Sequence, residues 1–241
     1  MQHTITTSKD GSNTLQLTQY NESYHSTNGA YTEAMHIYIK CGLEHLYTKT
    51  LAKHIDIFDI GFGTALNCIL AYNWQQELKQ SGMSYPIIKY WGIEKFPIHP
   101  SETQILNYPD IIARHSNTPL QKLQEIFSRI HNSPWEEDMA IQEHSFTLHK
   151  CCADIATLQQ EYYRQAKSPA AIFYDTFSPA TQPQLWDEKI FRNITQGCLP
   201  GSTLVTYCCK GTVKQALRSA GFTIERLAGP PGKRHILRAT L

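Results

Sequence analysis

The chain has 241 residues, 41% of them hydrophobic, and a formal net charge of +1. This length suits one α/β domain with a small addition, and the balanced charge excludes a global field of the kind that marks nucleic-acid or membrane binders. No stretch approaches the ~18 apolar residues of a membrane span, and the chain does not begin with a basic segment followed by an apolar one. We therefore expect a cytoplasmic protein with no membrane partner.

The first 50 residues predict a strand pair followed by a helix. Apolar and polar residues alternate on both sides of the turn at 9–12, which is typical of paired strands over 1–20. A helix is expected over 32–40, with Gly42 near its end. We treat 1–50 as one unit and 51–241 as the main domain.

From residue 55 onward, strands and helices alternate, which predicts a largely parallel sheet of βαβ units. The last two strands, joined by Gly229-Pro230-Pro231-Gly232, predict an antiparallel hairpin. The fold class is therefore α/β and Rossmann-like, with a mostly parallel sheet that ends in a C-terminal antiparallel hairpin. We interpret the long interval 96–145 as a solvated addition at the domain edge. The strands are expected at 55–60, 87–93, 145–150, 170–174, 202–208, 222–227 and 234–240, and the helices at 64–81, 101–107, 119–131, 155–166, 183–195 and 211–220.

The most informative stretch places an apolar run, Asp59 and the turn Gly61-Phe62-Gly63 just before an amphipathic segment. Glycines in such a turn allow positive φ and let the backbone approach a nucleotide-type ligand, although an ordinary loop is the alternative. A dinucleotide site needs a third Gly or Ala where this chain has Leu66. A class I methyltransferase, which binds S-adenosylmethionine, has a second acid at the end of the next strand instead. Glu94 fits that position, where a carboxylate can accept both ribose hydroxyls.

Two further acids follow later strands. Asp154 stands where a carboxylate can hydrogen-bond an adenine amino group, or where it only caps the next helix. The loop Asp175-Thr176-Phe177-Ser178-Pro179 lies at the sheet edge where α/β proteins bind ligands, and it is similar to the acid-Pro-Pro-aromatic loop of enzymes that methylate nitrogen. Asp175 can orient an amine or relay its proton, and an aromatic ring can lie near a sulfonium. The alternative is a rigid turn with Asp175 as a cap.

No metal is expected. Methyl transfer from a sulfonium is an in-line displacement in which the donor already carries the activation, so the protein mainly positions the nucleophile. The seven cysteines are an odd set without Cys-x-x-Cys spacing, and we interpret them as reduced, partly buried thiols.

The segment from residue 210 to the end carries seven basic residues and only one acid, Glu225. On a nearly neutral chain this local excess predicts a phosphate-facing surface, with a solvated helix face as the alternative. The residues that we expect to contact RNA are Lys210, Lys214, Arg218, Lys233 and Arg234.

Several motifs occur in one order, and together they carry a resemblance to a known family. They are Gly61-Phe62-Gly63-Thr64, Glu94-Lys95-Phe96-Pro97, Asp154, the 175–179 loop followed by Gln182-Pro183-Gln184-Leu185-Trp186, and Ser219-Ala220-Gly221-Phe222. With them, the chain resembles the methyltransferase domain of the bacterial tRNA 5-methylaminomethyl-2-thiouridine enzymes, from about Tyr20 to 232–235. It departs from that family at Ala65 and Thr176, where glycine is frequent.

The resemblance implies an activity and its partners. Enzymes of that family use S-adenosylmethionine to methylate the primary amine of 5-aminomethyl(-2-thio)uridine at the tRNA wobble position, and in many a flavin-dependent oxidase domain follows. The chain stops at residue 241, so the resemblance implies a stand-alone methyltransferase without flavin that acts on the aminomethyl form. It further implies the tRNA anticodon arm as partner and a functional link to the enzymes that install the aminomethyl group.

The resemblance also implies roles for single residues. Asp175 and Phe177 are expected to position the amine as catalytic residues, while Tyr24, Ser26 and Glu33 of the N-terminal unit close over the site. The residues expected to bind the donor are Asp59, Gly61, Gly63, Thr64, Asn67, Glu94, Lys95, Asp154 and Asp175.

Three other interpretations compete with this one. An N-methyltransferase for a small-molecule amine or a protein would use the same donor site, with the basic segment merely solvated. A non-catalytic RNA-binding or partner module has no need for Asp59, Glu94 and Asp175 together. An NAD-dependent dehydrogenase is disfavoured by Leu66.

Overall fold

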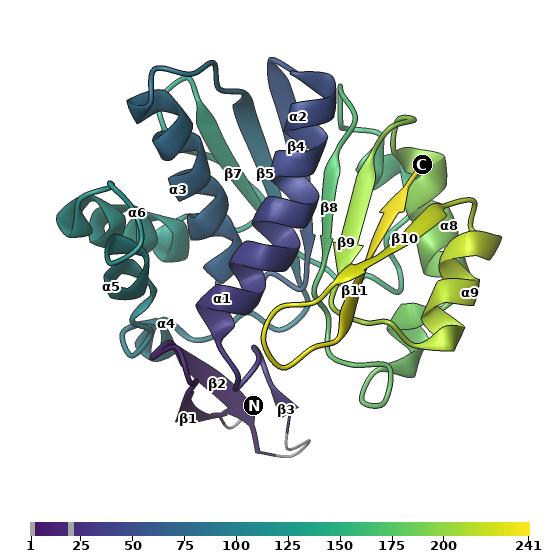
Figure 1. Ribbon diagram of the computed structural model, residues 1–241, viewed down its shortest axis with the longest axis horizontal. Coiled ribbons are helices and arrows are strands. Elements are labelled where there is room, and N and C mark those ends of the chain that lie inside the picture. Colours follow the sequence, from purple (N-terminus) through teal and green to yellow (C-terminus); the bar gives the residue numbers. More distant parts are fainter. Residues whose placement is uncertain (1–2, 19–21) are drawn as a thin grey trace.

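The computed structural model describes residues 3–18 and 22–241, and its strands form two sheets (Figure 1). The smaller sheet comes from the N-terminal segment, where β1 (His3–Thr7), β2 (Asn13–Leu17) and β3 (Glu22–Ser23) pair antiparallel in that order. The predicted strand pair is therefore confirmed. Positions 1–2 and 19–20 of its predicted range lie outside the described residues.

The main sheet has the strand order β10-β11-β9-β8-β4-β5-β7-β6. Its five central strands run parallel, while β6 joins one edge and the β10–β11 hairpin joins the other in antiparallel pairing. The predicted parallel sheet with a C-terminal hairpin is confirmed, but the edge strand β6 was not predicted. The bounds are β4 (His54–Ile60), β5 (Ile87–Glu94), β6 (Asp138–Gln142), β7 (Phe146–Cys152), β8 (Ala171–Tyr174), β9 (Thr203–Thr206), β10 (Thr223–Ala228) and β11 (His235–Thr240).

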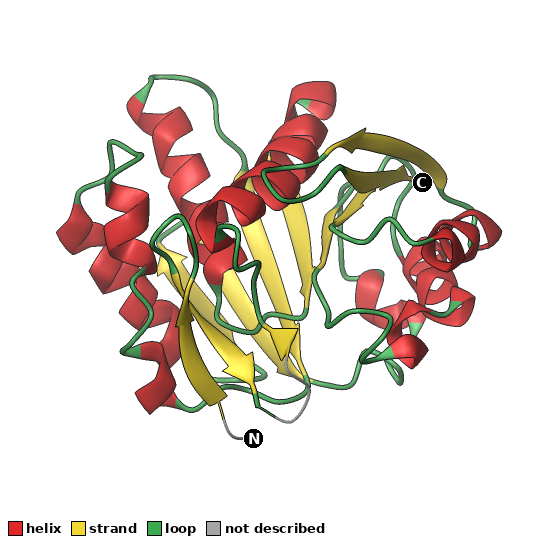
Figure 2. Ribbon diagram, turned by 60° about the horizontal axis from the view of Figure 1, so that its bottom comes forward, coloured by secondary structure: helices red, strands yellow, loops and turns green. Residues whose placement is uncertain are grey.

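Helices cover both faces of the main sheet (Figure 2). Alternate residues of β4 enter opposite cores, with Ile57 in one and Phe58 in the other. Because both faces are covered, the central strand β8 is a continuous buried apolar run. No helix in the described ranges is long and apolar enough to cross a membrane. The bounds are α3 (Leu66–Gln80), α4 (Pro100–Thr103), α5 (Tyr108–Ala113), α6 (Leu120–Asn132), α7 (Gln160–Tyr163), the 3₁₀ helix η2 (Pro183–Trp186), α8 (Glu188–Gly197) and α9 (Gly211–Ser219).

The helix predicted over 32–40 is part of a longer rod. α1 (Ala30–Ala34) continues into the π-helical segment η1 (Met35–Glu44) and then into α2 (His45–Thr50). Gly42 lies inside η1, where a Cβ would come 2.7 Å from the Val205 side chain, so the glycine allows close packing on the sheet rather than ending a helix. The rod shares its core with α3, and the division of the chain at residue 50 stays a prediction.

The prediction that 96–145 is a solvated addition is wrong for α5 and α6. The α6 side chains Leu123, Ile126, Phe127 and Ile130 are buried in the same core as α3. Their spacing places them on one helix face, which therefore packs against the domain. The acidic segment 136–138, at the start of β6, is exposed.

Two predicted helices are shorter than expected because acidic residues begin new turns. In 155–166, the Asp154 carboxylate and carbonyl accept the N–H groups of the following residues and close a separate turn, so only α7 is helical. In 183–195, the Asp187 side chain accepts the Lys189 N–H at 3.0 Å and caps α8, which separates it from η2.

One side chain of the small sheet caps the helical rod. α1 has no side-chain cap of its own at Gly29, but Asp10 Oδ2 accepts the N–H and the hydroxyl of Thr32 at 2.9 and 3.0 Å. The other carboxylate oxygen accepts from the Ser8 hydroxyl and the Ser12 N–H at 2.7 and 3.1 Å. Burial acts to raise the pKa of Asp10, but the hydrogen bonds outweigh it and lower the pKa to about 2.

Replacing Asp10 is therefore expected to destabilise the fold. Asp10→Ala should lower the free energy of unfolding by about 1–2 kcal/mol at pH 7, measured by urea denaturation, because it removes a helix cap. The folded pKa of about 2 lies below the ordinary 3.8, so this contribution is complete above about pH 4 and is lost as the pH falls towards 2. Glu137→Ala, on the exposed edge, is the control and should change little. Equal stability of wild type and Asp10→Ala at pH 7 would contradict the capping role.

Candidate active site

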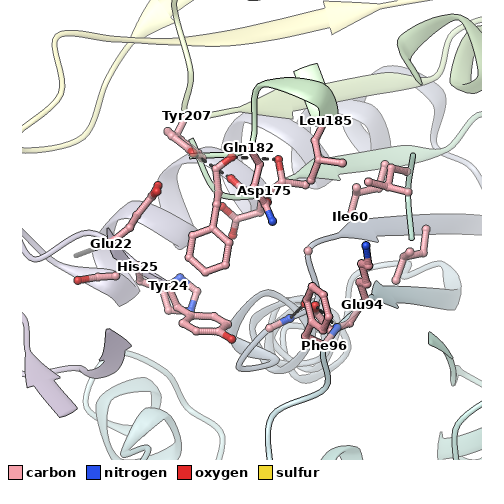
Figure 3. A pocket seen from close by; sticks show the side chains of 18 of the residues that line it. Glu22, Tyr24, His25, Ile60, Glu94, Phe96, Asp175, Gln182, Leu185 and Tyr207 are labelled. Atoms are coloured by element: carbon pink, nitrogen blue, oxygen red, sulfur yellow. Dashed lines mark hydrogen bonds between the residues drawn. The ribbon is translucent and has the colours of Figure 1, made fainter. Parts of the chain in front are cut away.

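A cavity of about 490 Å³ lies at the carboxyl ends of the central strands. Its walls come from the N-terminal segment 22–27, the helical rod, the glycine turn after β4, the end of β5, and the loops that follow β7 and β8. Figure 3 shows Tyr24, Glu94 and Asp175 around a common space. Segments far apart in the sequence thus build one site at the sheet edge where α/β folds bind ligands.

The glycine turn is required by close backbone packing. Gly61 has φ 96° and a Cβ there would lie 2.6 Å from the carbonyl oxygen of Asp175, while Gly63 has φ 47° and approaches the Tyr24 ring. Ala65 follows at φ 61°, in the left-handed region. This conformation explains why glycine suits that position and why the alanine of this chain is strained there.

Glu94 ends β5 beside the glycine turn, as predicted. Its carboxylate accepts the Gly63 N–H at 3.1 Å and the Phe96 N–H at 2.9 Å, and it lines the cavity. Burial raises the pKa of Glu94 against the opposing effect of these N–H groups. The carboxylate is thus fixed by the backbone, with lone pairs left for a ligand.

The next two predicted donor residues form an ion pair on the same wall. Lys95 Nζ lies 2.7 Å from Asp154 Oδ2, and both residues line the cavity. Asp154 Oδ1 accepts the Ala156 N–H at 2.9 Å. Asp154 is therefore a turn cap and a cavity residue at once, and its contact with an adenine amino group stays a prediction.

Asp175 projects from the loop after β8 and is held at both oxygens. The Tyr38 hydroxyl donates to Oδ1 at 2.5 Å, and the Asn67 side-chain amide donates to Oδ2 at 3.0 Å. Burial raises the pKa of the Asp175 carboxyl to about 6, although both hydrogen bonds act to lower it. A carboxyl group with this pKa is mostly ionised at neutral pH and can accept a proton.

Three predicted donor residues lie behind the cavity wall. Asp59, Thr64 and Asn67 are buried, and none is among the described residues that line the cavity. Asp59 accepts the Tyr90 hydroxyl at 2.6 Å and contacts the Asn67 amide at 3.4 Å, and burial raises its pKa well above the usual range. Thr64 Oγ1 lies 2.6 Å from His25 Nε2. These contacts support the glycine turn and Asp175, and direct donor binding by the three stays a prediction.

The N-terminal segment covers the cavity. Tyr24, Ser26 and Glu33, which we expected to close over the site, all line it. The Tyr24 ring packs edge-on against Phe177, with centroids 5.2 Å apart. Glu22, which sequence reasoning missed, accepts the Ser178 N–H at 2.8 Å and so joins β3 to the loop of Asp175.

Of the five predicted RNA-contacting residues, Lys233 alone lines the cavity among the described residues. Its ammonium lies 2.5 Å from Glu33 and 4.9 Å from the centroid of the Tyr207 ring. Arg234 is the next residue, and Lys214 and Arg218 share one face of α9 because they are four residues apart. The RNA contacts of these residues and of Lys210 stay a prediction.

The cavity residues that sequence reasoning missed also include His25, Tyr38 and Tyr207. His25 belongs to the polar aromatic segment that precedes the rod, which was a usable signal. Tyr38 lies in the middle of the rod, where a tyrosine is indistinguishable from a core residue.

Comparisons with known proteins identify the family of this chain. A family model described as S-adenosyl-L-methionine-dependent methyltransferase matches residues 118–241, which include Asp154 and Asp175. The bifunctional tRNA 5-methylaminomethyl-2-thiouridine biosynthesis protein MnmC of Delftia acidovorans is 25% identical over 92% of this chain, and that of Idiomarina loihiensis is 27% identical over 91%. These matches cover 32% and 36% of the two relatives, so the chain spans about a third of their length. They confirm the resemblance drawn from the motifs.

A solved structure shares the fold. The crystal structure of MNMC2 from Aquifex aeolicus aligns with a TM-score of 0.73 at 23% identity, over 100% of this chain and 70% of that one. The strand order, the glycine turn and Glu94 at the end of β5 fit a class I methyltransferase fold. The chain belongs to the family of S-adenosyl-L-methionine-dependent methyltransferases.

Proposed function

We propose that this chain methylates the primary amine of 5-aminomethyl(-2-thio)uridine at the wobble position of tRNA, with S-adenosylmethionine as the methyl donor. The names of its relatives supply the substrate class. One observation carries the proposal: Asp175, held by Tyr38 and Asn67, faces the same cavity as Glu94 and the glycine turn.

The donor half of the cavity suits S-adenosylmethionine. Gly61 and Gly63 line the cavity with backbone alone, which suits the amino-acid moiety, and the Glu94 carboxylate can accept the ribose hydroxyls. Asp154 and Lys95 stand beside it, where an adenine ring would lie. None of these contacts needs a metal or a flavin.

The acceptor half suits an amine. In the transfer, the nitrogen lone pair attacks the methyl carbon, the carbon–sulfur bond breaks, and its electron pair stays on sulfur to give S-adenosylhomocysteine. An alkylammonium must first lose a proton, and the Asp175 carboxylate can orient the N–H bonds and accept that proton. The Phe177 ring, edge-on to Tyr24, closes the aromatic side of this half.

The nucleic-acid part of the proposal rests on charge and chemistry at the rim. A wobble base must leave its stack to reach a cavity of this depth, and aromatic rings such as Tyr24 and Phe177 suit a flipped base. Lys210, Lys214, Arg218 and Arg234 then provide phosphate contacts along the anticodon arm. We place the protein in the cytoplasm, downstream of the enzymes that install the aminomethyl group.

A transfer assay tests the proposal directly. Labelled S-adenosylmethionine is incubated with tRNA from cells that lack this protein, followed by nucleoside mass analysis. We expect label in 5-methylaminomethyl(-2-thio)uridine, and an affinity for tRNA that falls steeply with added salt because phosphate contacts release counterions. Donor binding without label in tRNA would contradict the proposal and would favour a small-molecule amine or a protein as acceptor.

Asp175→Asn should abolish most of the transfer while leaving donor binding intact. We expect turnover to fall about 10²–10⁴-fold, the usual range for a lost acid–base group. In the wild type the carboxylate must be ionised, so kcat/KM should fall as the pH drops through the pKa of about 6. Calorimetry with S-adenosylmethionine is the control for folding. Normal turnover of Asp175→Asn would show that the role is misassigned.

Gly61→Ala should weaken donor binding at least tenfold. The added Cβ would meet the Asp175 carbonyl oxygen at 2.6 Å, so the two loops that hold donor and acceptor must separate. Gly82→Ala is the matched control, because that glycine also has a positive φ (71°) but nothing within 4 Å of its Cβ position. Equal donor affinity of the two variants would mean that the contact between the loops is not needed.

A further inference from the structure

The helical rod contains a segment with unusual winding next to the site. η1 spans the ten residues Met35–Glu44 as π-helix, which is rare in proteins and is frequent at functional sites. Ile37, Tyr38 and Ile39 are all buried, although three successive residues of an amphipathic helix would not normally face one core. Among them, Tyr38 carries the polar group.

The Tyr38 hydroxyl donates a hydrogen bond to a carboxylate that lines the cavity. It donates to Asp175 Oδ1 at 2.5 Å, and the ring packs on Phe173 with centroids 5.5 Å apart. Tyr38 is 2% exposed, so its hydroxyl is shielded from bulk solvent. Burial and the neighbouring Asp175 charge raise the pKa of Tyr38 well above its usual range, which keeps the hydroxyl a donor.

We propose that Tyr38 is a positioning residue for methyl transfer, which fixes the orientation of the Asp175 carboxylate towards the target amine. This role rests on the proposed function. One oxygen is held by Tyr38 and the other by Asn67, so two hydrogen bonds oppose rotation of the carboxylate, and Asp175 lines the cavity. The structure thereby assigns a task to a residue that no sequence motif marks.

Several charges face Asp175 from the surrounding elements. Glu33 of α1 acts to raise the pKa of Asp175, and Lys233 acts to lower it. Because Glu33 and Lys233 pair with each other at 2.5 Å, their effects partly cancel. Asp59 on β4 lies behind Asn67. The charge of Asp175 also acts on three tyrosines, Tyr90 of β5, Tyr108 of α5 and Tyr207 after β9. Burial is the largest influence on Asp175, and the Tyr38 hydrogen bond is the strongest one that opposes it.

Tyr38→Phe removes this hydrogen bond and keeps the ring. Loss of a donor to the ionised form should raise the pKa of Asp175, so the acid limb of kcat/KM should move up by about one pH unit. At pH 6 the variant should then be about fivefold less ionised at Asp175 than the wild type, and slower in proportion. Tyr47→Phe is the control, because it removes a hydroxyl from the same rod at its far end, where the hydroxyl donates to the Ser84 carbonyl.

A second measurement does not depend on the substrate. The Asp175 carboxyl carbon is titrated by ¹³C NMR in labelled protein, with the signal assigned by its loss in Asp175→Asn. A higher midpoint in Tyr38→Phe than in wild type and Tyr47→Phe supports the proposal. An unchanged NMR midpoint, or an unchanged acid limb in a variant that binds the donor normally, overturns it.

The two proposals fail in different ways. If wild-type protein transfers no label to tRNA, the proposed function fails, and the NMR titration still decides whether Tyr38 holds Asp175. If wild type is active and Tyr38→Phe keeps both its acid limb and its NMR midpoint, the function stands and the role of Tyr38 is wrong. Urea denaturation of both tyrosine variants separates these effects from a general loss of stability.

Discussion

The site depends on the close approach of two loops at the carboxyl edge of the sheet. The turn after β4 comes so near the loop after β8 that a Cβ on Gly61 would lie 2.6 Å from the Asp175 carbonyl. These strands are neighbours in the sheet, and Asp175 N donates to Ile60 O at 2.9 Å. The fold therefore brings the glycine turn and the Asp175 carboxylate together without a long connecting loop.

This close approach places the carboxyl groups of Asp59 and Asp175 in a buried region, where the surrounding polar groups influence their pKa values. Asp59 and Asp175 share the Asn67 amide, at 3.4 and 3.0 Å. Burial raises the pKa of both, but Asp175 has a pKa of about 6 whereas that of Asp59 is well above its usual range. Two like charges so close are unfavourable, and the charge of Asp175 acts together with burial to raise the pKa of Asp59. Tyr38 donates to Asp175 and acts to lower the pKa of that carboxyl.

The sequence predicted the parts of the site that follow from strand ends. Glu94 ends β5, and Asp154 and Asp175 follow the ends of β7 and β8; parallel strands bring such residues to one edge. It did not predict what depends on tertiary contacts. The packing of α6 was missed because an apolar helix face does not by itself show which surface it covers. The edge strand β6 was missed because it is short and half exposed, and Tyr38 because nothing local signals π-helical winding.

The N-terminal segment that covers the cavity is also positioned by tertiary contacts. Glu22 reaches the Ser178 N–H across 156 residues of chain, and a Cβ on Gly232 would collide with the Asn28 side chain. The N-terminal segment is thus held between the Asp175 loop and the turn that carries Lys233. The same segment is joined to the rod by Asp10, whose capping of α1 fixes the helix that presents Glu33 and Tyr38. The small sheet therefore stabilises the fold and also helps to fix the positions of the cavity residues Glu33 and Tyr38.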